Sequence, residues 1–186
     1  MEERNPKKTI RNIIILILVC LIVAGGAFWF SRTFLIVFPI DGSSMENTLH
    51  NGDNVVLFKI HNVKYDNVVV FVKPDWIEGE TTKYYVKRVI GLPGDHIEIK
   101  YDAEEGLFHV YRNGSILDES HIKEPVNEFY NEVSVDVPEG KFFFLGDNRM
   151  HSNDSHTLGG TYLGTITDIV GIAFVRYTGW TDISFL

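Results

Sequence analysis

Tyr84-Tyr85-Val86-Lys87-Arg88-Val89-Ile90-Gly91-Leu92-Pro93-Gly94-Asp95 is the stretch that indicates the fold most clearly. Residues 83–90 are rich in β-branched and aromatic side chains and predict a strand, and the Gly-Leu-Pro-Gly-Asp that follows predicts a turn. Side chains alternate along a strand, so Tyr85, Lys87 and Val89 should share one face. If that face is buried, the Lys87 pKa falls and a neutral amine becomes available as a base. A lysine on a solvated strand face is the ordinary alternative.

Short segments of the same kind recur along the chain, and no window after residue 32 has sustained helical periodicity. Turn signals such as Asn51-Gly52-Asp53 and Asn113-Gly114 separate them. The predicted strands are 34–40, 54–59, 67–73, 83–90, 96–101, 108–112, 116–117, 133–137, 141–145 and 169–177, with polar loops at 75–82 and 118–132. The first of them is also interpreted as a membrane-hugging segment. The pattern predicts an antiparallel, mostly β domain.

An apolar run of 19 uncharged residues, 13–31, precedes this domain. As a helix it would span roughly 28 Å, the hydrocarbon thickness of a bilayer. Four basic residues precede it and only Arg32 follows closely, which predicts a cytoplasmic segment 1–12, a transmembrane anchor 13–31 and an extracytoplasmic domain 32–186. A cleaved signal peptide is the alternative, since residues 24–27 are small. The aromatic residues 28–30 suit a membrane interface and favour an uncleaved anchor.

Charge and cysteine content exclude several classes of function. Residues 1–32 hold five basic and two acidic residues, whereas the remainder holds 12 basic and 23 acidic residues. Such an acidic domain is a poor nucleic-acid binder, because phosphate contacts need clusters of lysine or arginine. Cys20 is the only cysteine. An intramolecular disulfide and a cysteine-based zinc site are therefore both impossible.

Two further segments gather groups that can do chemistry. Asp41-Gly42-Ser43-Ser44-Met45-Glu46-Asn47-Thr48-Leu49 lies between an apolar strand and a turn, and a serine on such a bend exposes its hydroxyl. Gly146-Asp147-Asn148-Arg149-Met150-His151-Ser152-Asn153-Asp154-Ser155-His156 follows a predicted strand directly. A serine of this loop could orient a lysine amine, and an Asp–Arg pair could brace the loop. Either segment alone is also ordinary turn chemistry.

In this order, the segments resemble the bacterial type I signal peptidases of the Gram-positive type. The family pattern Ser-Met-x-Pro-Thr-Leu corresponds to residues 44–49, and Gly-Asp-x-Val corresponds to residues 52–55. The family's lysine segment matches residues 85–95 almost throughout, and Gly-Asp-Asn-Arg-x-x-Ser-x-Asp-Ser matches residues 146–155. The resemblance covers the whole chain. It implies a mostly β catalytic domain behind a single transmembrane helix, with a small β insertion at about residues 97–140.

The resemblance implies a membrane serine endopeptidase that removes signal peptides from secreted preproteins after small residues, in the pattern Ala-x-Ala. Ser44 would be the nucleophile and Lys87 the general base. Ser152 would orient the amine, and Asp154 and Arg149 would brace the loop. The oxyanion and substrate pocket would include Gly42, Ser43 and Met45. No metal or organic cofactor is implied, and the partners are preproteins and the lipid bilayer. The oligomeric state stays open, with a monomer as the expectation.

Two departures from the family pattern leave alternatives open. Asn47 stands where the family has proline, and His156 stands where the family has the arginine that pairs with Asp154. A histidine cannot offer the bidentate fork of arginine and titrates near neutral pH. One alternative is an assembly or chaperone factor dedicated to one surface-export system, such as a pilus. Others are a Ser-His-Asp hydrolase that uses His151 or His156 with Asp154, and a metal site formed by His151, Asp154 and His156. A self-cleaving regulator is disfavoured, because the chain has an anchor and lacks a DNA-binding segment.

Overall fold

A computed structural model describes residues 6–59, 62–72, 84–127, 131–157, 159–160, 162–179 and 181–186. The chain divides into two compact units, Met1–Ile36 and Val37–Leu186. The loop predicted at 75–82 lies outside the described residues.

The first unit is built around one long helix, α1 (Pro6–Phe34), which is longer at both ends than the predicted anchor 13–31. Its apolar side chains are exposed all along, and the stretch Lys7–Phe34 is long and apolar enough to cross a membrane. The Ser31 and Thr33 hydroxyls donate to the carbonyls of Phe28 and Trp29, which satisfies the polar groups of its last turns internally. A long apolar helix with exposed side chains is compatible with a membrane anchor.

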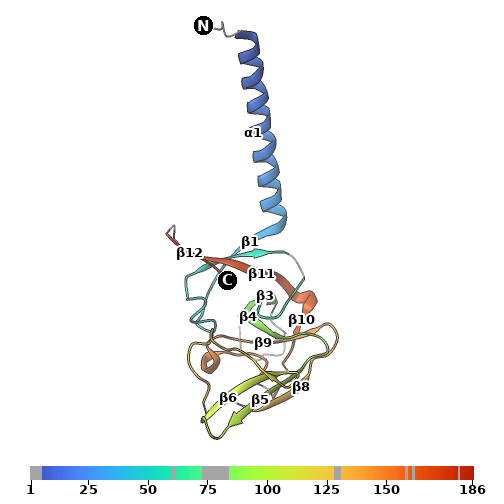
Figure 1. Ribbon diagram of the computed structural model, residues 1–186, viewed down its shortest axis with the longest axis vertical. Helices are drawn as coiled ribbons and strands as arrows, with labels where there is room; N and C mark the ends of the chain where they lie inside the picture. Colours follow the sequence, from blue (N-terminus) through green and yellow to red (C-terminus); the bar gives the residue numbers. More distant parts are fainter. Residues whose placement is uncertain are drawn as a thin grey trace. The chain divides into compact units, whose positions relative to one another are not determined.

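The second unit is antiparallel β structure, as predicted (Figure 1). The strands are β1 (Leu35–Pro39), β2 (Asn54–Phe58), β3 (Val68–Val72), β4 (Tyr84–Gly91), β5 (His96–Asp102), β6 (Leu107–Arg112), β7 (Ser115–Ile116), β8 (Val133–Asp136), β9 (Lys141–Leu145), β10 (Gly164–Thr165), β11 (Ile169–Thr178) and β12 (Asp182–Phe185). An eight-stranded sheet has the order β1-β2-β11-β3-β4-β9-β10, with β12 paired to β11. A smaller sheet has the order β7-β6-β5-β8.

Strand bounds agree with the prediction to within one or two residues, with two omissions. The strands β10 and β12 were not predicted. β10 has two residues, too few for any alternation to be visible. β12 does alternate, since the apolar Ile183 and Phe185 are separated by Ser184, but four residues at the end of the chain form a weak pattern.

The strand β9 joins the two cores of the domain, and Figure 1 shows it between β4 and the small sheet. Phe142 and Phe144 pack into one core with Phe71 of β3, whereas Phe143 and Leu145 pack into the core of the small sheet. All four of these β9 side chains are fully buried. The strand therefore reads as a continuous apolar run, and it gives a rigid base to the loop that begins at Gly146.

Candidate active site

Lys87 points into the protein and not into solvent. The burial of β4 alternates as predicted, with Tyr85, Lys87 and Val89 buried on one face. Only 3% of Lys87 is exposed, and its Nζ lies 5.1 Å from the centre of the Tyr85 ring. The solvated-face alternative for this lysine is therefore excluded.

Ser44 lies beside this amine. The Lys87 Nζ donates a hydrogen bond of 2.5 Å to the Ser44 Oγ. The two residues are 43 positions apart in the chain, and they meet because the turn after β1 passes the buried face of β4. The structure thus brings together the two residues that the sequence singled out as nucleophile and base.

Both residues line a cleft with a volume of about 330 Å³. Its apolar wall comprises Phe38, Pro39, Ile40, Met45, Tyr85 and Val86. The predicted pocket residues Gly42, Ser43 and Met45 all line it, and Met45 is only 2% exposed. Gly42 has a φ of 111°, which only glycine adopts readily, and its N–H donates to the Asn51 side chain at 3.0 Å. His151 and Asn153 contribute polar groups to the cleft.

The loop after β9 holds the backbone of the nucleophile turn. The Asn148 N–H donates to the Ser44 carbonyl at 3.0 Å, and the Asn148 side-chain amide donates to the Ser43 carbonyl at 3.0 Å. The Ser44 N–H shares a trans peptide with the Ser43 carbonyl, and the two groups point in opposite directions. Because the Ser43 carbonyl faces the Asn148 side chain, the Ser44 N–H is directed away from Asn148. This role of Asn148 was not predicted. Its signal in the sequence was a side-chain amide three residues after a buried strand.

Gly146 fills the narrow space between the two serines of the site. A Cβ built on Gly146 would lie 2.2 Å from the Ser152 Oγ and 2.5 Å from the Ser44 carbonyl oxygen. The Ser152 Oγ is buried and has no hydrogen-bond partner among the described residues. The expected hydrogen bond from Ser152 to the Lys87 amine is thus not formed here, although Ser152 belongs to the same group of residues.

Asp154 and Arg149 both brace this loop, through partners other than each other. Asp154 is fully buried, accepts the Gly146 N–H at 2.9 Å and contacts the His156 ring. Arg149 donates from Nε to the Gly146 carbonyl at 3.1 Å and forms an ion pair of 2.5 Å with Glu119. The sequence suggested that an Asp–Arg pair braces the loop. The structure instead gives Asp154 a histidine partner and gives Arg149 a carboxylate, Glu119, from the segment that follows β7.

A second buried ion pair links the same segments. Arg88 contacts Asp147 through Nε at 2.9 Å and through Nη2 at 2.6 Å, a two-pronged geometry that favours pairing. The Thr48 hydroxyl also donates to Asp147. Arg88 alternates with Lys87 along β4 and so lies on the opposite face of the strand, and neither Arg88 nor Asp147 was expected to have a role. Two neighbouring residues of β4 therefore point in opposite directions: Lys87 points to the cleft, and Arg88 points to the loop after β9.

His121 lies next to this pair. Its Nε2 is 3.7 Å from the Asp147 carboxylate. Burial lowers the pKa of His121, the nearby Arg88 lowers it further, and Asp147 acts in the opposite direction with a smaller effect. The net result is a histidine that prefers to be neutral in the folded chain.

This lowered pKa predicts an acid-sensitive fold. As pH falls through the pKa of an unfolded histidine, about 6.5, the unfolded chain takes up a proton before the folded chain does, so the stability contributed by neutral His121 is lost. Between pH 7.5 and pH 5.5, the full chain in detergent should lose more of its unfolding free energy than the His121→Gln variant does. Chemical denaturation followed by near-ultraviolet circular dichroism measures this, and equal losses would contradict the expectation.

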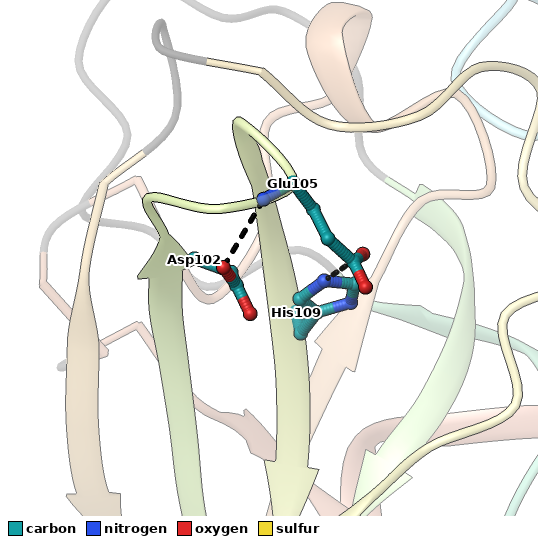
Figure 2. A group of neighbouring side chains, drawn as sticks. All are labelled: Asp102, Glu105 and His109. Atoms are coloured by element: carbon teal, nitrogen blue, oxygen red, sulfur yellow. Dashed lines mark hydrogen bonds and ion pairs between the residues drawn. The ribbon is translucent and has the colours of Figure 1, made fainter.

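A third polar cluster lies away from the cleft, on the β5–β6 hairpin (Figure 2). Asp102 Oδ1 accepts the backbone N–H groups of Glu104 and Glu105, at 2.8 Å and 3.2 Å. The Glu105 carboxylate pairs with His109 at 3.0 Å. These contacts stabilise the hairpin turn and an adjacent exposed pair of side chains, and none of the three residues lines the cleft of Ser44 and Lys87.

Comparison with known proteins gives one consistent result. The family model "Signal peptidase, peptidase S26" matches residues 10–180. A probable signal peptidase I-1 from Synechocystis sp. is 35% identical over 182 residues, which cover 93% of this chain and 85% of that protein. Signal peptidase I P from Bacillus subtilis subsp. natto is 34% identical, covering 92% and 90% of the two chains.

A further relative and one solved structure are similar as well. Signal peptidase I S from Bacillus subtilis is 33% identical over 193 residues, covering 95% of this chain and 94% of its own. A crystal structure of a signal peptidase I from Enterococcus faecalis V583 matches with a TM-score of 0.46 and 25% identity, covering 59% of this chain and 95% of that chain.

Proposed function

Since the chain belongs to the signal peptidase family, peptidase S26, we propose that it is a signal peptidase I that cleaves signal peptides from exported preproteins, with Ser44 as nucleophile and Lys87 as general base. The observation that carries this proposal is the 2.5 Å contact between Lys87 Nζ and Ser44 Oγ. A general base has to lie within hydrogen-bond reach of the proton that it removes.

The reaction begins when the neutral Lys87 amine takes the proton from the Ser44 hydroxyl as Oγ attacks the scissile carbonyl. The resulting ammonium then gives this proton to the leaving amine, and an acyl-enzyme on Ser44 remains for water to hydrolyse. Lys87 is almost completely buried, and burial penalises the charged form of an amine. The site therefore favours the protonation state that the first step needs.

Two neighbouring groups would assist this chemistry. The Ser44 N–H, turned away from Asn148, would donate to the developing oxyanion. The Ser152 hydroxyl, buried and without a partner among the described residues, is available to orient the Lys87 amine. Catalytic hydrogen bonds are often loose in the free enzyme and tighten when substrate binds, so we expect the Ser152–Lys87 bond in the complex.

The preprotein would lie extended in the cleft. β3 pairs with β4 along Tyr84–Arg88, whereas β9 pairs with β4 only from Arg88 onward, so within the described residues the first half of β4 has one open edge. An extended peptide can add to such an edge through backbone hydrogen bonds. The apolar wall that includes Met45 and Tyr85 would then receive small side chains before the cleavage site.

The proposed site is tied to a membrane surface. Residues 13–31 would cross the lipid bilayer, with 1–12 in the cytoplasm and 32–186 outside, where about 97–140 form a small β insertion. Preproteins are held at the same surface by their own apolar segment. Restricting enzyme and substrate to one surface raises their effective concentration.

Cleavage of a preprotein by the purified full chain in detergent tests this proposal. A substrate with alanine one and three residues before the cleavage site should be cut there, as identified by mass spectrometry of the new N-terminus. Replacing the alanine before the cut by phenylalanine should lower kcat/KM by about 10- to 100-fold, because overfilling a packed apolar pocket costs about 1–3 kcal/mol. A leucine placed five residues after the cut is the matched control.

Two results of the same assay would contradict the proposal. A wild-type chain that is as inactive as its Ser44→Ala variant on every preprotein would favour the assembly-factor alternative. Equal cleavage of the alanine and phenylalanine substrates would contradict the assignment of the apolar wall as the pocket for the residue before the cut.

A further inference from the structure

Residues 117–124, the segment that follows β7 of the small sheet, contact the loop after β9 and the nucleophile turn. The Lys123 N–H donates to the Asp147 carbonyl at 3.0 Å, and the Lys123 ammonium pairs with Glu46 at 2.7 Å. Glu119 pairs with Arg149 at 2.5 Å. This segment therefore supports both the nucleophile turn and the loop after β9, and the Glu119–Arg149 ion pair is more deeply buried than the Lys123–Glu46 ion pair.

The partner of Glu119 is a buried charge. Only 1% of the Arg149 side chain is exposed, and 13% of the Glu119 side chain. A guanidinium taken out of water is strongly destabilising unless a carboxylate or several acceptors compensate it. Glu119 supplies a carboxylate from a segment 30 residues earlier in the chain, so it contributes to the position of Arg149.

Arg149 in turn fixes the position of Gly146, which packs against both serines of the site. Its Nε binds the Gly146 carbonyl at 3.1 Å, while Asp154 binds the Gly146 N–H at 2.9 Å. Gly146 is packed so tightly against the Ser44 carbonyl and the Ser152 hydroxyl that no Cβ fits there. A displacement of Arg149 is therefore passed to both serines.

We propose that Glu119 is a positioning residue of the peptidase site, acting through Arg149 and Gly146 on the geometry of Ser44, Lys87 and Ser152. This inference rests on the proposed function. Glu119 does not line the substrate cleft. Its loss should therefore lower kcat and leave KM nearly unchanged, since only the alignment of the reacting groups is disturbed. Misplacement of about 1 Å at a catalytic group can cost about 100-fold in rate.

The test compares variants of the full chain in detergent on one preprotein substrate. Glu119→Ala should lower kcat by about 10- to 100-fold with KM within about threefold of wild type, and Glu119→Gln, which keeps the volume and one acceptor, should restore part of kcat. Adding Arg149→Met to Glu119→Ala removes the buried charge, so the double variant should be no slower than Glu119→Ala alone. If the alanine variant does not fold, the kcat of the Glu119→Gln variant still tests the inference.

Glu98→Gln is the matched control. Like Glu119, Glu98 is a partly buried carboxylate. It lies in β5 of the small sheet, and it pairs with Lys100 at a distance of 2.7 Å. Its kcat per folded molecule should equal that of wild type. If the Glu119 variants lose kcat only in proportion to their folded fraction, or keep the wild-type kcat, the inference is overturned. Activity retained in both Ser44→Ala and Lys87→Met would instead overturn the proposed function, which separates the two failures.

Discussion

Replacing Lys87 by methionine is expected to lower kcat for preprotein cleavage at least about 1,000-fold, with little effect on stability. Methionine is an unbranched apolar side chain of similar length, and a position that is 3% exposed should accept it. The variant lacks the amine that contacts the Ser44 hydroxyl, and an unactivated serine is a weak nucleophile. Removing one member of a unit that acts together can cost nearly the whole catalytic effect.

Three further variants make this result specific. Lys87→Arg should be equally inactive, because a guanidinium stays protonated and cannot act as a base. Ser44→Ala combined with Lys87→Met should be no slower than either single variant, since both act on one step. Lys141→Met is the control: Lys141 is a half-buried lysine that donates to Thr165 at 3.0 Å, and its loss should leave kcat unchanged.

Retained cleavage in Lys87→Met would point to a different base. His151 lines the same cleft as Ser44 and would become the candidate for a serine–histidine mechanism. Loss of that residual activity in Lys87→Met combined with His151→Gln would establish this alternative. Single-turnover kinetics separate the chemical step from product release in each case.

The pattern along β4 predicted the orientation of Lys87 correctly, because period-two alternation is a local property of a strand. Tyr85, Lys87 and Val89 were expected on one face, and all three are buried there. The meeting of Lys87 with Ser44 is different. No periodicity relates residues 43 positions apart, so their proximity was expected from the family resemblance alone.

The role of residues 117–124 could not be predicted from the sequence. Residues 118–124 lie in a stretch interpreted as a polar loop, and the contact of Glu119 with Arg149, 30 residues later, depends on the tertiary fold. One signal was present: an arginine directly after a buried strand and a turn needs a carboxylate partner. The sequence suggested an Asp–Arg pair within the loop, but Asp154 accepts the Gly146 N–H and contacts the His156 ring, and Asp147 pairs with Arg88. The histidine at position 156 thus fits a loop whose arginine is neutralised from elsewhere.

Gly146→Ala is expected to lower kcat by at least about 100-fold, although alanine suits the backbone conformation at this position. The cost comes from space: the new Cβ would lie 2.2 Å from the Ser152 Oγ and 2.5 Å from the Ser44 carbonyl oxygen. Neither contact can be relieved without moving a serine of the site by about 1 Å, a displacement that can cost about 100-fold in rate. Steady-state cleavage of one preprotein by the full chain in detergent measures this loss.

Gly171→Ala separates this effect from simple overpacking. Gly171 is buried in β11, where it pairs with Val70 of β3, and its Cβ would lie 2.8 Å from the Phe58 carbonyl oxygen of β2. The substitution is therefore also crowded, but Gly171 does not line the cleft. Both alanine variants should melt at a lower temperature than wild type, because overpacking lowers the free energy of unfolding by about 1–3 kcal/mol. Only Gly146→Ala should lose kcat per folded molecule at temperatures well below melting. Equal kcat in the two variants would mean that the contact of Gly146 with Ser44 and Ser152 does not govern catalysis.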